Sequence, residues 1–253
     1  MNIVSAIKRL FAQTFMVLLL LLILLAGNAA AQDSDNDGFT DPQEIAGITL
    51  LNGQILPRCP DNALATDACV DPAGADLFVI LVAVGGARVP ANPLSFMVNL
   101  TPSVGVHQIA DNPDRLIVAG VAQKAIRLIL DPDLNDTIWG ISLRQGTPLT
   151  AGDGTVFTAR IRRTLDNKYT AATGSPAPQD VVDNCIRHTI AHEAGHNKSI
   201  SPQSDSRFGG NHYATSDKVV MSQSATITSK GTRVTVVCPS NYASPDVTGF
   251  RLK

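Results

Sequence analysis

The sequence contains the pentapeptide His192-Glu193-Ala194-Gly195-His196, an H-E-x-x-H motif. This pattern demands a helix, because residues four apart project from one helix face and two imidazoles at that spacing can share a zinc ion. The Glu beside the first His then lies next to the metal-bound water. Glutamate is otherwise confined to Glu44, and the chain of 253 residues has 5 histidines, so the arrangement is improbable by chance. The motif predicts the metal site of a zinc hydrolase.

A third zinc ligand must come from elsewhere in the chain. No Glu follows Glu193, which excludes the class of zinc peptidases with a downstream Glu ligand. His212, in the Gly-rich turn 208–213, is the best candidate, and Asp205 or Asp217 is an alternative. His188 lies one turn before the motif, but one straight helix cannot supply three tetrahedral ligands. It is therefore predicted to be a supporting or packing residue.

The H-E-x-x-H motif, the later His212 and then Met221 after two valines together resemble the metzincin metallopeptidases. The resemblance implies an α+β, zincin-like fold, with a twisted mixed sheet, an active-site helix and Met221 in a turn beneath the zinc. It also implies that Glu193 is the general base that activates the water. The sequence departs from the usual string, which continues with Gly and a third His. Here Ser199 and Pro202 occupy those positions, and the candidate His is displaced to His212, which an insertion between the helix and the ligand would explain.

An acidic segment at 33–44 follows the pattern D-x-D-x-D-G-x-x-D-x-x-E. Oxygen ligands at positions 1, 3, 5, 7, 9 and 12, with Gly at position 6 for the sharp turn, suit the hard cation calcium. The segment resembles a thrombospondin type 3 calcium repeat, and also an EF-hand loop without its flanking helices. The alternative is an acidic, solvated linker. The predicted ligands are Asp33, Asp35, Asp37, the carbonyl of Phe39, Asp41 and Glu44.

Residues 1–31 have the features of an export signal. Lys8 and Arg9 precede the apolar run 15–26, and three alanines at 29–31 form a cleavage site. The run is short for a membrane span, although an uncleaved anchor is the alternative. We therefore expect a secreted, periplasmic or cell-surface protein without a stable membrane span after cleavage. The formal net charge of -2 gives no basic field for nucleic acid.

The 4 cysteines would enter an oxidising compartment, where disulfides persist. We predict the pairs Cys59–Cys69 and Cys185–Cys238, against the alternatives of free thiols or a four-cysteine zinc site. The predicted organisation is a signal peptide at 1–31, a calcium-binding loop and Cys-containing linker at 32–75, and a zincin-like metallopeptidase domain at 76–253.

Hydrophobic periodicity and turn residues give a coarse secondary structure. The predicted strands cover 76–84, 126–130, 137–143 and 156–162, with a hairpin turn at 150–155 and helices starting near Asn112 and at Asp180. The helix that starts at Asp180 ends with the H-E-x-x-H motif. An extended peptide would pair with an exposed strand within 137–162.

The predicted function is an exported, monomeric, zinc-dependent endopeptidase acting on a protein or peptide, with structural calcium. The alternative is a non-catalytic, calcium-dependent surface or binding protein whose zinc is structural, closed by Asp205 or Asp217 as a fourth ligand. The intact Glu193 favours catalysis, because a structural site does not need it. Another zinc hydrolase, such as an amidase, is a third reading.

Overall fold

A computed structural model of the protein describes residues 32–35, 37–60, 69–97, 104–119, 121, 124–133, 138–142, 153–197, 220 and 225–241. The predicted export signal at 1–31 lies outside these ranges, as do His212 and Met221 and the alternative ligands Asp205 and Asp217. Among the described helices, none is both long enough and apolar enough to cross a membrane.

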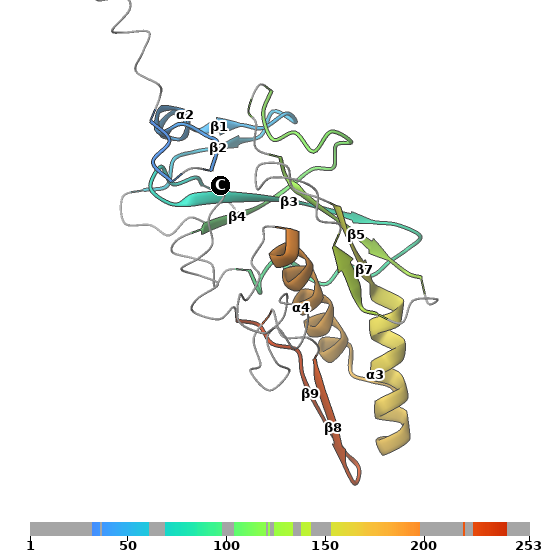
Figure 1. Ribbon diagram of the computed structural model, residues 1–253. Coiled ribbons are helices and arrows are strands. Elements are labelled where there is room, and N and C mark those ends of the chain that lie inside the picture. The colour runs from blue at the N-terminus through green and yellow to red at the C-terminus, as the bar shows by residue number, and fades with distance from the viewer. Residues whose placement is uncertain are drawn as a thin grey trace, which may run out of the picture.

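A five-stranded mixed sheet forms the centre of the protein, in the order β4-β3-β5-β7-β6 (Figure 1). Four strands are parallel, whereas β6 runs antiparallel to β7 at one edge. Their bounds are β3 Ala75–Ala83, β4 Val104–Ile109, β5 Ile126–Asp131, β6 Gly140–Ser142 and β7 Asp153–Phe157. The α+β class and the mixed sheet that the sequence predicted are therefore confirmed.

Both faces of the sheet are covered, which explains why β3 is apolar along nearly its whole length. Leu77 and Val79 belong to a core shared with the long helices, while Phe78 and Ile80 belong to a second core. The alternation follows from the two-residue period of a strand. Each side chain of β3 in this stretch is therefore buried in one core or the other.

The helices α3 Thr158–Thr173 and α4 Gln179–Asn197 pack against the first face. On the second face lie the short helix α2 Asp41–Ala46 and the two-stranded sheet of β1 Ile48–Thr49 and β2 Ile55–Leu56 (Figure 1). A hairpin of β8 Thr226–Lys230 and β9 Arg233–Val237 contacts α3. The N-terminal segment, residues 32–60 with α2, β1 and β2, thus contributes to the core on the second face of the sheet.

Two local predictions were wrong. No helix starts at Asn112, because its side chain bonds to both the amide and the carbonyl of Leu116 and closes a turn. Arg115 has a φ of 56°, which a right-handed helix does not accept. The predicted strand at 156–162 ends at Phe157, where α3 begins.

The short apolar–polar alternation at 156–162 is compatible with the two-residue period of a strand and with the 3.6-residue period of a helix. In the structure Ile161 and Leu165, four residues apart, are both buried on one face of α3, as the helical period requires. Residues 153–155, predicted as part of a hairpin turn, lie in β7. The antiparallel pairing of β6 with β7 that this turn implied is present. The strands predicted at 76–84, 126–130 and 137–143 correspond to β3, β5 and β6.

Both predicted disulfides are present, Cys59–Cys69 and Cys185–Cys238. The first closes a short loop beside the N-terminal segment. The second joins the middle of α4 to the residue after β9. Among the described residues there is no free cysteine, a pattern typical of proteins from oxidising compartments.

Candidate active site

The H-E-x-x-H motif occupies the last turns of α4, as its spacing required. His192 and His196 project from the same face, and their Nε2 atoms lie 3.0 Å apart. His192, Glu193 and His196 are buried, with 9%, 4% and 9% of their surface exposed. Two nitrogen lone pairs at this separation repel each other, so a proton or a metal ion must lie between them.

A backbone carbonyl fixes the tautomer of His192. Its Nδ1 lies 2.7 Å from the carbonyl oxygen of Val220. Because a carbonyl can only accept, Nδ1 must carry the hydrogen, and in the neutral ring Nε2 then keeps its lone pair. Metal-ligating histidines usually have their second nitrogen held in this way. The sequence did not predict this role of Val220, because no local pattern indicates that a backbone carbonyl 28 residues further along the chain will contact His192.

The segment after β9 holds this carbonyl in position. The amide of Val220 donates to the carbonyl of Asn241 at 2.8 Å. The same segment is fastened to α4 by the Cys185–Cys238 disulfide and by His188, whose Nδ1 donates to the carbonyl of Pro239 at 2.8 Å. His188 is therefore a packing and positioning residue, as expected, and burial lowers its pKa to about 4.

The carboxylate of Glu193 lies against the edge strand β6. A Cβ atom added to Gly140 would lie 2.5 Å from Oε1 and 2.8 Å from Cγ of Glu193, so any larger residue there would force the Glu193 side chain or β6 to shift. Burial raises the pKa of Glu193 to about 8. Gly140 was not predicted, although a glycine within a strand signals a close approach.

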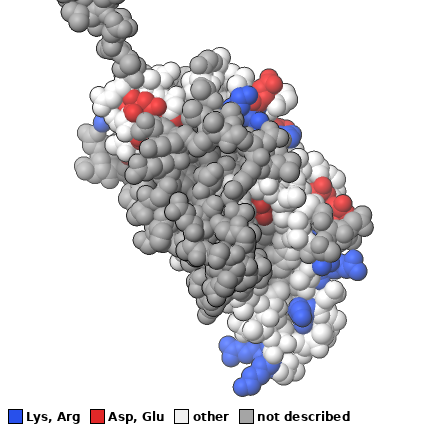
Figure 2. All heavy atoms as spheres, in the orientation of Figure 1, with Lys and Arg blue, Asp and Glu red and all other residues white. Residues whose placement is uncertain are grey.

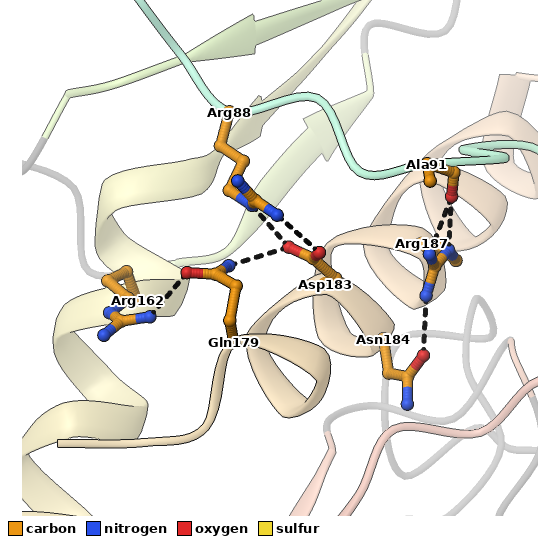
Figure 3. Close-up of polar contacts among 7 residues, drawn as sticks. All are labelled: Arg88, Ala91, Arg162, Gln179, Asp183, Asn184 and Arg187. Carbon is orange, nitrogen blue, oxygen red and sulfur yellow. Dashed lines mark hydrogen bonds and ion pairs between the residues drawn. The ribbon is translucent and has the colours of Figure 1, made fainter.

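The N-terminal half of α4 is fixed by charged hydrogen bonds (Figure 3). Arg88 donates to both oxygens of Asp183, at 2.6 and 2.7 Å, and Gln179 donates to one of them. Arg187 reaches the carbonyl of Ala91. The hydrogen bonds from Arg88 hold the pKa of Asp183 below its ordinary value. These contacts fasten the segment after β3 to the helix that carries the motif.

The two histidines fit zinc. Zinc bonded tetrahedrally to two imidazole nitrogens separates them by roughly 3.3 Å, close to the 3.0 Å found here. The hydrogen bond at His192 Nδ1 leaves the correct nitrogen for the metal. The predicted third ligand, His212, lies outside the described residues, as do the turn of Met221 and the alternative aspartates.

The N-terminal acidic loop brings three of its predicted calcium ligands together. Asp33, Asp35 and Asp37 each offer an oxygen, and these oxygens all lie within 4.8 Å of one another. Gly38 has a φ of 101°, the left-handed turn that the sixth position requires. Figure 2 shows acidic side chains gathered at the surface around this end of the protein. The loop therefore suits a hard divalent cation.

Other predicted ligands of this loop are arranged differently. Both oxygens of Asp41 accept hydrogen bonds from Ser34, each at 2.8 Å, which closes the loop. Glu44 lies in α2, fully buried and close to Asp37. The helix begins at Asp41 because Thr40 and Gln43 form a capping box. The side chain of Phe39 is buried in the second core.

A further carboxylate, Asp76 of β3, joins Asp37 and Glu44. Sequence analysis did not select it, although a charged residue that begins an apolar strand was a usable signal. Mutual burial raises the pKa of these groups. It rises to about 7 for Asp37 and to about 10 for Glu44, where neighbouring carboxylates add to the burial. A bound cation would remove this penalty.

Comparison of the chain with models of protein families, with curated proteins and with solved structures gave no match.

Proposed function

We propose that the protein is an exported, zinc-dependent endopeptidase with a metzincin-like site on a zincin-like fold. The observation that carries the proposal is the convergence of the His192 and His196 Nε2 atoms at 3.0 Å, with the buried Glu193 between them in sequence. A mixed sheet that packs on the motif helix supports it. The two disulfides are consistent with export.

His192 and His196 would hold the zinc, together with His212 by the sequence argument. When bound there, zinc would supply Lewis acidity toward a water molecule and the scissile carbonyl. Glu193 would act as the general base that takes a proton from the attacking water and as the acid that returns it to the leaving amine.

The substrate would lie along β6. In the described part of the sheet, β6 is an edge strand that pairs with β7 alone, so its other edge can add an extended peptide. Gly140 at the start of β6 lies next to the Glu193 side chain, so a peptide on that edge would lie close to the proposed general base. This narrows the expected substrate-binding strand within 137–162 to β6.

The N-terminal cation would be structural. Phe39 and Leu56 of the N-terminal segment share a core with Phe78 of β3, so an ordered loop at 33–44 stabilises the packing on that face of the sheet. The buried carboxylates of this loop also suit the alternative function, a calcium-dependent binding protein with structural zinc. The two functions differ in whether the zinc site turns over a substrate.

The test combines zinc analysis with peptide hydrolysis. The purified protein should keep one zinc per chain after dialysis and should hydrolyse a panel of fluorogenic peptides. Glu193→Gln should keep the zinc and lose at least a hundredfold in kcat, because a positioned general base contributes about 10²–10⁴-fold. His192→Ala should lose the zinc. A folded protein without zinc would exclude the endopeptidase, and zinc with full turnover in Glu193→Gln would exclude Glu193 as the base.

A further inference from the structure

Three buried carboxylates from separate parts of the chain meet at the junction between the N-terminal segment and the sheet. They are Asp37 of the acidic loop, Glu44 of α2 and Asp76 of β3, and each is 0% exposed. One oxygen of each lies within 4.8 Å of the other two. A second group consists of Asp33, Asp35 and Asp37, and the two groups share Asp37.

Glu44 is the member that points to a ligand. Both of its carboxylate oxygens are buried, and none of the described residues donates a hydrogen bond to either of them. An ionised carboxylate buried without donors is strongly destabilising. The capping box at Thr40 fixes the helix that turns this side chain inward, so the arrangement is built into the local structure.

The other two carboxylates are oriented by hydrogen bonds. Asp37 accepts from the amides of Phe39 and Asp76, both at 2.8 Å. Asp76 Oδ1 lies 2.6 Å from Nε2 of His107, a buried residue of the neighbouring strand β4. Hydrogen bonds of this kind around ligating carboxylates commonly orient them toward a metal.

We propose that Asp37, Glu44 and Asp76 bind a second divalent cation, beside the one in the acidic loop and sharing Asp37 with it. The donors are carboxylate oxygens, so the ion belongs to the hard class, and Ca²⁺ is the representative that the loop already favours. The cation links the N-terminal segment directly to β3, the first strand of the sheet. The proposal is independent of the zinc site.

Calcium titration of the metal-stripped, purified protein by isothermal calorimetry tests this site. The unmodified protein should bind two Ca²⁺ per chain. Glu44→Gln and Asp76→Asn should each lose one equivalent or bind it at least tenfold more weakly, while keeping the other. Asp33→Asn should weaken the loop position and leave the junction position. Asp111→Asn, which removes a carboxylate paired with Arg127, controls for charge and should still bind two.

Circular dichroism identifies variants that fold, and Glu44→Gln tests the site if the buried Asp76→Asn does not. The proposal is overturned if folded Glu44→Gln binds two Ca²⁺ with unchanged affinity. It is also overturned if the unmodified protein binds a single ion that Asp33→Asn abolishes, because all the carboxylates would then serve one position.

Discussion

Gly140→Ala is the substitution for which the structure gives the sharpest expectation. The added methyl would lie 2.5 Å from Oε1, 2.8 Å from Cγ and 2.9 Å from Cδ of Glu193. Ordinary contact begins near 3.4 Å, so the carboxylate must move by about 0.9 Å or β6 must shift away. The Glu193 side chain is buried and has little room to move. Overpacking of this kind costs about 1–3 kcal/mol of stability.

The same displacement should reduce hydrolysis if the proposed function is correct. A misplacement of about 1 Å at a reacting centre lowers the rate by roughly a hundredfold. Zinc content should stay at one per chain, because the three atoms nearest to the new methyl group all belong to Glu193. Urea unfolding measures the stability, and a fluorogenic peptide measures kcat. Ser229→Ala, at an exposed position on β8, adds no volume and should leave both close to those of the unmodified protein.

A double-mutant cycle isolates the contact itself. Glu193→Ala removes all three atoms that the methyl group would meet, so Gly140→Ala should cost little stability in that background. The coupling energy should therefore be about 1–3 kcal/mol, and this result does not depend on catalysis. If Gly140→Ala is as stable and as active as the unmodified protein, the close approach of β6 to Glu193 is refuted.

Four further predictions concern the two metal sites, an ion pair and a disulfide. Calcium chelation should lower the melting temperature, because a ligand of the folded state stabilises it; an unchanged value would favour a solvated linker. His212→Ala should weaken zinc binding at least tenfold in a chelator competition, and unchanged affinity would move the third ligand to an aspartate. Arg88→Ala should cost about 1 kcal/mol of stability in urea. The stability difference between the unmodified protein and Arg88→Ala should have its full size above pH 3.8, the ordinary pKa of Asp183. It should vanish as the pH falls through the lowered pKa of Asp183 in the folded protein. Replacing both Cys185 and Cys238 by serine should lower the free energy of unfolding by about 4 kcal/mol, because the unfolded chain loses the constraint of a 53-residue loop. A variant as stable as the unmodified, oxidised protein would contradict this.

Long, strongly patterned segments were predictable. The apolar run at 76–84 corresponds to β3, because its β-branched residues and the Gly85-Gly86 stop favour a buried strand. The helix from Asp180 corresponds to α4, because helical periodicity is sustained over many residues there. The turn at Asn112 was not predictable in the same way. There a side chain bonds to the backbone four residues on, which imitates a helix start without forming one.

The sequence by itself determined which side chains share a helix face. The H-E-x-x-H spacing and the acidic loop pattern are local features, so they could be inferred without a fold. Both disulfide pairs were predicted, but the Cys185–Cys238 pair joins residues 53 positions apart, and only the fold brings these two cysteines together. The tertiary structure alone decided what surrounds these local features. It brought the Val220 carbonyl to His192, Gly140 to Glu193, and Asp76 to the acidic loop. These contacts join residues that are 28 to 53 positions apart in the sequence. Their geometry depends on how the helices and strands pack, which no local sequence pattern encodes.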